Sequence, residues 1–219
     1  MGPELRVGLA HVLWIGGATD TGKSTIARNL AARHGMLVYH YDKTDVEHYI
    51  KLAETIPEIQ KFNDASLDER WVYPEPQDLF ERSLRSFSLR FPFMVEDILA
   101  LPNDIPIIAE GFGLLPEFIH PMLSSLYQAI WFVPSEKFKW DSMAWRGKPS
   151  FANMTTDPEK AKMNLFRRDV LLADYYRKQV PAYGYTLFEI DGTRSAEEVT
   201  DLSDEHFAKY RELDKLNGL

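Results

Sequence analysis

The sequence predicts a three-layer α/β sandwich built on a mostly parallel sheet. Five short apolar runs typical of strands alternate with segments of helical periodicity, and a glycine-rich turn joins the first run to the first helix. Strands that alternate with helices usually pair in parallel, because each helix returns the chain to the starting edge of the sheet. At 219 residues, the chain is long enough for one core of this kind.

The glycine-rich turn, residues 17–24, has the spacing G-x-x-x-x-G-K-S and follows the apolar run 11–16. Such a turn directs successive backbone N–H groups around an anion, and the helix behind it adds the positive end of its dipole. We expect Lys23 to reach the terminal phosphates of a nucleotide and the Ser24 hydroxyl to bind Mg²⁺. Asp20 puts a carboxylate into this turn, so we expect its side chain to face solvent or a partner. The residues assigned to this phosphate-binding turn and the start of its helix are Gly17, Ala18, Thr19, Asp20, Thr21, Gly22, Lys23, Ser24 and Thr25.

Acidic residues follow the second and third apolar runs. Run 36–40 leads into Asp42 and Asp45, and run 105–110 ends at Glu110. The carboxyl ends of parallel strands open onto the ligand crevice, so these acids are placed to meet a substrate. Glu110 can receive a Mg²⁺-bound water or orient an attacking hydroxyl. The alternative is a carboxylate that simply leaves the core for water.

Residues 45–100 have a helical pattern and depart from simple strand–helix alternation. Apolar residues spaced by three or four predict an amphipathic helix in its second half, which Pro92 should kink or break. Arg82 falls opposite the apolar stripe, with Arg85 and Arg90 to either side. Two interpretations stay open: solvated charges on an amphipathic helix, or an arginine that meets an anionic substrate across the cleft.

Runs 129–134 and 186–190 complete the five expected strands. Between them, residues 146–157 are rich in glycine, proline and polar side chains, which is typical of a mobile loop. A helix follows from about Pro158. After the last strand, the spacing S-x-x-E at 195–198 predicts the capping box of a final helix.

Composition excludes several classes of protein. The net charge of −8 argues against nucleic-acid binding, since an acidic chain has no general attraction for a phosphate backbone. The absence of cysteine excludes a disulfide framework and fits a reducing cytoplasm. We find no apolar run of about 18 residues and no cleavable signal, and therefore expect a cytoplasmic protein without a membrane anchor. The histidines lack metal-ligand spacing, and only His40 stands at a strand end near the acids.

These motifs resemble those of the P-loop kinase superfamily of nucleoside, nucleotide and small-metabolite kinases. The phosphate-binding turn carries most of the resemblance, and Glu110-Gly111 after an apolar strand looks like the uridine-kinase-like members. The resemblance covers nearly the whole chain and implies a single P-loop NTPase domain, residues 1–219, with the sheet order 2-3-1-4-5. It also implies a helical acceptor-binding insertion at about 45–100 and a lid at about 141–160.

The resemblance further implies ATP and Mg²⁺ as cofactors and assigns roles to single residues. Asp42 would contact or deprotonate the acceptor, and arginines of the lid would close over the phosphates. Residues 191–193 look like the adenine-contacting loop of adenylate-kinase-like enzymes. The catalytic candidates are Lys23, Asp42, Glu110, Arg146 and Arg168; the metal candidates are Ser24 and Glu110; the nucleotide contacts outside the turn are Arg167, Asp191, Gly192 and Thr193.

Together, these features predict an ATP- and Mg²⁺-dependent phosphotransferase acting on a hydroxyl or phosphate of a small molecule. A loose phosphoryl-transfer transition state needs cations around its oxygens and exclusion of water, which a closing, arginine-bearing lid supplies. A nucleoside or nucleotide acceptor is the nearest alternative. An alternative of another class is a nucleotide-binding regulatory protein or an ATPase without a small-molecule acceptor. The sequence does not identify the acceptor, does not distinguish ATP from GTP as the phosphate donor, and does not say whether the protein is a monomer or a homodimer.

Overall fold

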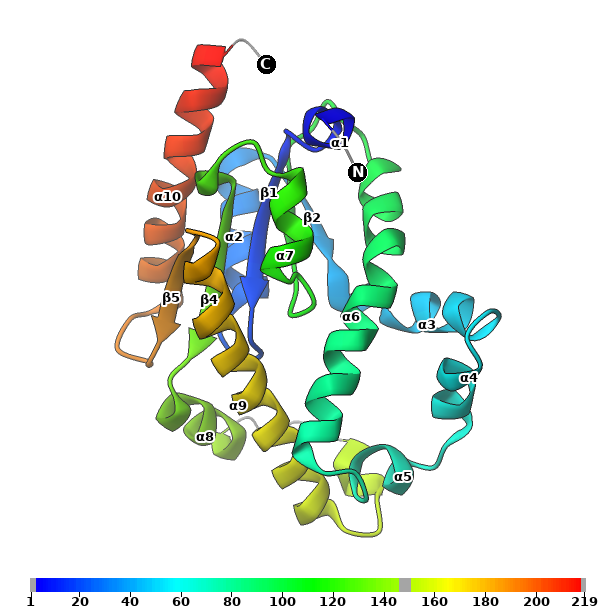
Figure 1. Ribbon diagram of the computed structural model, residues 1–219. Helices are drawn as coiled ribbons and strands as arrows, with labels where there is room; N and C mark the ends of the chain where they lie inside the picture. The colour runs from blue at the N-terminus through cyan, green and yellow to red at the C-terminus, as the bar shows by residue number, and fades with distance from the viewer. Residues whose placement is uncertain (1–2, 146–150, 218–219) are drawn as a thin grey trace.

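The computed structural model describes residues 3–145 and 151–217. Within these residues, five strands form one parallel sheet in the order β2-β3-β1-β4-β5, which confirms the predicted class and strand order. All strand arrows point the same way in Figure 1, toward α8 and the first turns of α9. The strands are β1 (Val12–Gly17), β2 (Leu37–His40), β3 (Ile107–Glu110), β4 (Ala129–Pro134) and β5 (Thr186–Ile190).

Helices join the strands and extend the chain beyond them. The predicted capping box is present where Ser195 and Glu198 exchange hydrogen bonds at the start of α10. Gly35, with a φ of 65°, ends α2 in the left-handed conformation that glycine adopts readily. The helices are α1 (Pro3–Gly8), α2 (Lys23–His34), η1 (Tyr41–Thr44), α3 (Asp45–Ala53), α4 (Pro57–Asp64), α5 (Leu67–Trp71), α6 (Pro76–Leu99), α7 (Pro116–Ile119), η2 (His120–Met122), η3 (Leu126–Gln128), α8 (Glu136–Trp145), η4 (Phe151–Met154), α9 (Pro158–Ala182) and α10 (Ala196–Asn217).

The central strand β1 separates two apolar cores, one on each face of the sheet. Val12 and Trp14 belong to the core beneath α6, α7 and α9, whereas Leu13 and Ile15 belong to the core beneath α2 and α10. Successive residues of a strand point to opposite faces, so a strand covered on both faces must be apolar throughout. All six residues of β1 are buried. This continuous burial fixes the end of β1, where the phosphate-binding turn begins.

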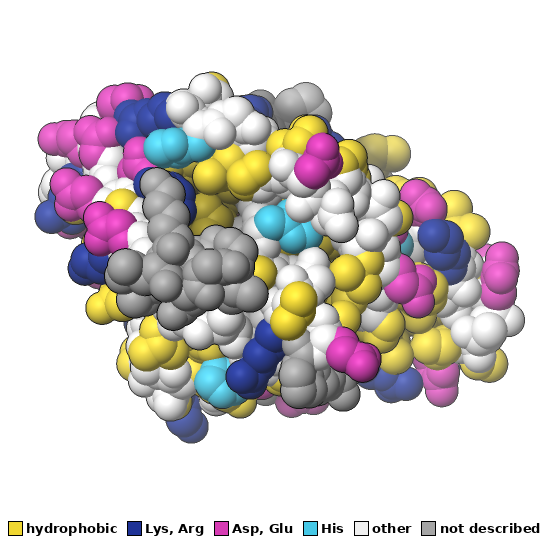
Figure 2. Space-filling view, turned by 90° about the horizontal axis from the view of Figure 1, so that it is seen from above, with side chains coloured by type: hydrophobic (Ala, Val, Ile, Leu, Met, Phe, Trp, Pro, Cys, Tyr) yellow, Lys and Arg dark blue, Asp and Glu magenta, His cyan; other side chains and the backbone are white. Residues whose placement is uncertain are grey.

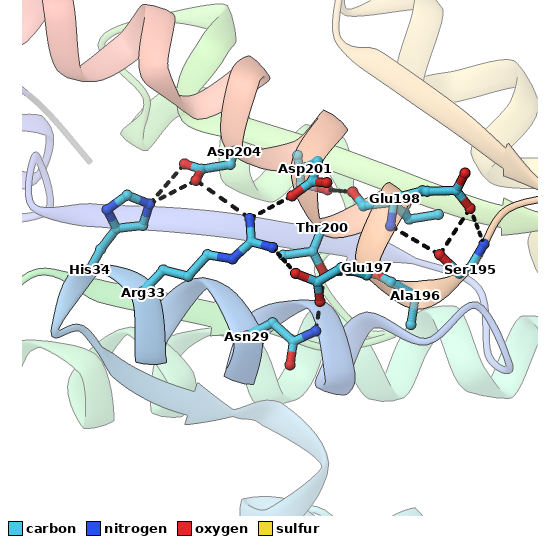
Figure 3. A network of polar contacts seen from close by, with 12 residues as sticks. Asn29, Arg33, His34, Ser195, Ala196, Glu197, Glu198, Thr200, Asp201 and Asp204 are labelled. Carbon is cyan, nitrogen blue, oxygen red and sulfur yellow. Dashed lines mark hydrogen bonds and ion pairs between the residues drawn. The ribbon is translucent and has the colours of Figure 1, made fainter.

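A polar network holds α10 against α2 on the outside of the second core (Figure 3). Arg33 Nη1 lies 2.8 Å from Asp201 Oδ1, and His34 Nε2 lies 2.9 Å from both carboxylate oxygens of Asp204. Exposed ion pairs contribute little singly, so the apolar contacts beneath them supply most of the stability of this packing. The network instead fixes how α10 is oriented on α2, the helix that follows the phosphate-binding turn.

Helix α6 continues through Pro92, so the predicted break at this residue is wrong. A proline inside a helix costs roughly 3 kcal/mol, because it removes one backbone hydrogen bond and crowds the preceding turn. Residues on either side of Pro92 bury large apolar side chains against the sheet, among them Phe91 and Met94. This packing offsets the local cost and keeps α6 continuous along the edge of the candidate site.

Figure 2 views the molecule from the end at which the strands begin, away from the phosphate-binding turn. Acidic and basic side chains are intermingled with apolar ones on this face. In the two described segments, no helix is both long enough and apolar enough to cross a membrane.

Candidate active site

The phosphate-binding turn has the backbone geometry that its glycines predict. Gly17 has a φ of 110°, and a Cβ added there would lie 2.0 Å from the carbonyl oxygen of Phe132, so only glycine fits. Gly22 has a φ of 80° and precedes α2 directly. The first backbone N–H groups of a helix have no partner within the helix and are available to an anion. The turn therefore has the form of an anion-binding nest.

Asp20 points away from this nest toward α8. It adopts a left-handed backbone, with a φ of 65°, and its carboxylate pairs with the ammonium group of Lys139. Lys139 is only 5% exposed; its Nζ also donates to Thr19 Oγ1 at 2.7 Å and to Asp169 Oδ2 at 2.6 Å. These contacts stabilise a backbone conformation that is unfavourable for a residue with a side chain. Nothing in the sequence around Lys139 marks it as part of this site, although an acid in a phosphate-binding turn is a signal that a cation lies nearby.

Lys23 is buried, and its side chain folds over the turn. Its Nζ donates to the Ala18 carbonyl at 2.5 Å and lies 3.4 Å from Thr21 Oγ1. Burial lowers the pKa of Lys23 to about 8, although the nearby carboxylates of Glu110 and Asp42 act to raise it. The ammonium group is therefore charged at neutral pH and titrates not far above it. Phosphate oxygens at the nest would meet this charge.

Three side chains from separate elements meet at the end of β3. Ser24 Oγ donates to Glu110 Oε1 at 3.0 Å, and His40 Nδ1 lies 2.6 Å from the same oxygen. Glu110 is 2% exposed, so the alternative of a carboxylate that simply leaves the core for water is wrong. A hydroxyl beside a buried carboxylate is a donor set that suits Mg²⁺, which binds one or two protein oxygens together with substrate phosphates. Over the described ranges, no three His, Cys, Asp or Glu side chains form a group that could hold a metal ion.

Asp42 lies on η1, directly after β2, and keeps contact with solvent. The surrounding protein raises the pKa of its carboxyl group to about 6: burial has the largest effect, Lys23 opposes it, and Glu110 adds to it. Asp42 follows β2 and Glu110 ends the neighbouring parallel strand β3, so both lie at the carboxyl edge of the sheet, where Lys23 begins α2. A carboxylate with a pKa near the working pH is suited to accept a proton.

Asp45 and Arg90 form an ion pair next to Asp42. Arg90 is fully buried, donates through Nη2 to the Tyr41 carbonyl at 3.0 Å, and stacks 4.0 Å over the Tyr41 ring. Asp45 is therefore committed to Arg90 instead of facing the crevice alone. The interpretation that the arginines of α6 are solvated charges is wrong for Arg90, which is buried, and fits Arg85, which is exposed.

The two adjacent arginines of α9 face different surroundings. Arg168 binds its neighbour Asp169 through Nε at 2.8 Å and lines a cavity against α3 and α6. Arg167 is exposed and lines a separate hollow with Trp140 and Phe166. Only Arg168 is thus connected to the phosphate-binding turn, through the pairing of Asp169 with Thr19. Arg146, the third predicted lid residue, lies outside the described residues.

The loop after β5 forms a tight turn. Asp191 Oδ1 accepts hydrogen bonds from the Thr193 backbone at 3.0 Å and from its hydroxyl at 2.7 Å, and Gly192 has a φ of 84°. A Cβ at Gly192 would lie 2.9 Å from the Phe138 ring of α8, so the loop packs directly on the helix that carries Lys139. Contact of this loop with adenine stays a prediction.

The sheet order, with a phosphate-binding turn after the central strand, is that of the P-loop kinase fold. No protein-family model matches the sequence, and the comparison with curated proteins found no match. Similar solved structures include a gluconokinase from Sinorhizobium meliloti 1021, with 14% identity, a TM-score of 0.48, and coverage of 95% of this chain and 97% of that one. A shikimate kinase from Bacteroides thetaiotaomicron has 13% identity and a TM-score of 0.45, with coverage of 95% of this chain and 98% of that one. A deoxyadenosine kinase from M. mycoides has 12% identity and a TM-score of 0.43, with coverage of 95% of this chain and 100% of that one. Likeness at this level identifies no reaction or substrate for this chain.

Proposed function

We propose that this protein is an ATP- and Mg²⁺-dependent kinase that phosphorylates a small molecule. One observation carries the proposal: the anion-binding nest, the buried Lys23, the Ser24–Glu110 pair and Asp42 all lie at the carboxyl edge of one sheet. Each part answers a requirement of phosphoryl transfer, namely a cradle for phosphates, a cation, oxygen ligands for a metal and a proton acceptor.

In this mechanism, the nest and Lys23 bind the β- and γ-phosphates of ATP. The acceptor hydroxyl loses its proton to the Asp42 carboxylate as its oxygen bonds to the γ-phosphorus. The bond between that phosphorus and the bridging oxygen then breaks, and ADP leaves with the bonding electrons. When the acceptor is a phosphate oxygen, Asp42 orients it and no proton is transferred. In this proposal Arg168, which lines a cavity against α3 and α6, balances the negative charge that spreads over the phosphoryl oxygens.

Ser24 and Glu110 would hold Mg²⁺ at this site, and the bound ion would supply charge neutralisation at the phosphates. His40 supports the carboxylate side of this pair, because its Nδ1 lies 2.6 Å from Glu110 Oε1. Such outer partners fix the orientation of a ligand carboxylate. His40 is therefore a positioning residue in this proposal.

The test is acceptor-stimulated ADP release by the purified chain with ATP and Mg²⁺, across a panel of alcohols, sugars, organic acids, nucleosides and nucleotides. Lys23→Ala should lower the stimulated rate about 10²–10³-fold, because it removes a cation from the transferring phosphoryl group. Arg28→Ala is the matched control, since Arg28 lies on the same helix with an exposed side chain. ATP binding without stimulation by any acceptor would favour the regulatory protein or simple ATPase instead.

A further inference from the structure

A cavity that is linked to the phosphate-binding turn through Arg168 and Asp169 is lined mostly by side chains that the mechanism does not use. It lies between α3, α6 and α9 and has a volume of about 100 Å³. An outer hollow of about 490 Å³ shares part of its wall, including Tyr49, Phe62 and Trp71. The two together are in the size range of small-molecule sites, roughly 300–1,000 Å³. Arg168 lines the inner cavity and connects it through Asp169 to the phosphate-binding turn.

Five of the twelve residues that line the inner cavity are aromatic, and most of the others are polar or charged. Phe62 and Trp71 meet edge to face, with ring centroids 6.0 Å apart, and Tyr49 lies 6.0 Å from Phe62 on its other side. Phe87 and Phe112 close the wall nearest the sheet, 5.1 Å apart. The aromatic side chains in this wall are suited to contact a flat ring of a ligand.

Three arginines line this aromatic cavity, and two of them already have acidic partners. Arg90 pairs with Asp45, and Arg168 pairs with Asp169. The Nε atom of Arg90 is nevertheless buried without a hydrogen-bond partner among the described residues. These two arginines are close to electrically balanced, but together they still offer unused N–H groups.

The third arginine, Arg82, is not balanced. Its guanidinium lies over the rings of Phe62, at 4.9 Å, and Trp71, at 5.5 Å, and Nη2 donates to the Arg70 carbonyl at 2.5 Å. In the described part of the chain, no carboxylate lies within ion-pair distance of it. Burial has the largest effect and lowers the pKa of Arg82; Tyr49 and Asp78 act to raise it, and the positive charges of Arg168 and Arg70 act to lower it. A partly buried cation facing a cavity without a counter-ion is stabilised when an anion enters.

We propose that this cavity binds the phosphate acceptor, and that the acceptor carries a carboxylate or phosphate group on a flat, largely apolar ring. Arg82 binds the anionic group, and Phe62 and Trp71 contact the ring. The assignment of the occupant as acceptor rests on the proposed kinase function. The chemistry of the occupant rests only on the cavity and its charges.

The experiment measures binding of three probes to the full chain without ATP: benzoate, phenyl phosphate and benzyl alcohol. Calorimetry should detect both anionic probes binding at least tenfold more tightly than the neutral alcohol. The stronger of benzoate and phenyl phosphate identifies the preferred anion. Absence of binding by both anions, or equal binding of the alcohol, overturns the proposal.

Variants of Arg82 show whether this residue is the anion ligand. Arg82→Gln should weaken the binding of the anionic probes at least tenfold and leave the binding of benzyl alcohol unchanged. Arg85→Gln, at the exposed position on the same helix, should change the binding of neither kind of probe. Arg82→Lys keeps the charge without the planar fork and should retain part of the binding. It also serves as a second variant if Arg82→Gln does not fold. Unchanged anion binding in a folded Arg82 variant refutes the role of this residue.

The two proposals fail in different ways. Lys23→Ala should abolish acceptor-stimulated ADP release and leave probe binding intact, because Lys23 does not line the cavity. If ADP release persists in Lys23→Ala, the kinase mechanism is wrong even where the probes bind. If wild-type turnover is stimulated only by neutral acceptors, the acceptor class is wrong and the kinase proposal stands.

Discussion

Lys139 links the phosphate-binding turn to α9, and replacing it with methionine should destabilise the protein strongly. The substitution keeps the length of the side chain and removes the ammonium group from three oxygen partners. Asp169, which is 9% exposed, would then be left buried with less compensation. Asp20 would lose the contact that holds its left-handed backbone.

The size of this effect follows from the burial of the pair. Breaking a buried ion pair from one side costs roughly 3–5 kcal/mol, because an uncompensated charge stays in the interior. Arg168 remains bound to Asp169 through two contacts of 2.6 and 2.8 Å, so the lower end of this range applies. A loss of about 3 kcal/mol raises the unfolding equilibrium constant by roughly 100-fold.

Urea unfolding measures this loss as a lower midpoint at an unchanged m-value. Lys137→Met is the matched control: Lys137 lies on the same helix, its side chain is 86% exposed, and its pair with Asp141 is a surface pair. Adding Asp169→Asn to Lys139→Met should recover more than half of the lost stability, since it removes the stranded charge. The reasoning is refuted if Lys139→Met costs less than about 1 kcal/mol, or no more than the control.

Three further predictions concern the carboxyl edge of the sheet. The kcat/KM of the free enzyme should rise through a pH of about 6, as Asp42 ionises, and fall above about 8, as Lys23 loses its proton; an acid limb that persists in Asp42→Asn would exclude Asp42 as its source. The same Asp42→Asn change should raise the Tm at pH 7.5 by about 2 °C, a value that includes a reduction for solvent screening. The reason is that a raised pKa makes the ionised carboxylate unfavourable in the folded state. Thermal unfolding should show this gain disappear near pH 4, and a gain that is independent of pH would contradict the cause. His40→Ala should raise the Mg²⁺ concentration for half-maximal activity about tenfold or more, because Glu110 loses its orienting partner; an unchanged Mg²⁺ titration would show that His40 does not act through Glu110.

The phosphate-binding turn and the alternation of strands and helices could be predicted from sequence because their signals are local, whereas the strand order was implied by the resemblance to P-loop kinases. The spacing of Gly17, Gly22 and Lys23 is set by the turn itself, and five apolar runs with intervening helices leave few possible topologies. The assigned roles of Asp42, Glu110 and the lid arginines stay predictions that the proposed experiments test.

The parts that could not be predicted depend on contacts between distant segments. Lys139 is 119 residues from Asp20 and 30 from Asp169, so nothing in its own neighbourhood marks it as buried. Helical periodicity placed Arg90 beside the apolar stripe of α6, but only the packing of α3 and η1 turns that position into a buried ion pair. Pro92 was predicted to interrupt a helix whose continuity is maintained by tertiary packing.

Arg168 belongs to two networks at once, and this has a thermodynamic consequence. It contacts Asp169, which also holds Thr19 and Lys139, and it forms part of the wall around Arg82. A ligand that draws Arg168 toward the aromatic wall removes Arg168 from Asp169. Lys139 then pairs more strongly with Asp169 and less strongly with Asp20. If a ligand moves Arg168 in this way, the affinities on the two sides of α9 are coupled, and linkage requires the same factor in both directions. Measuring the dissociation constant of a nucleotide with and without benzoate would give that factor directly.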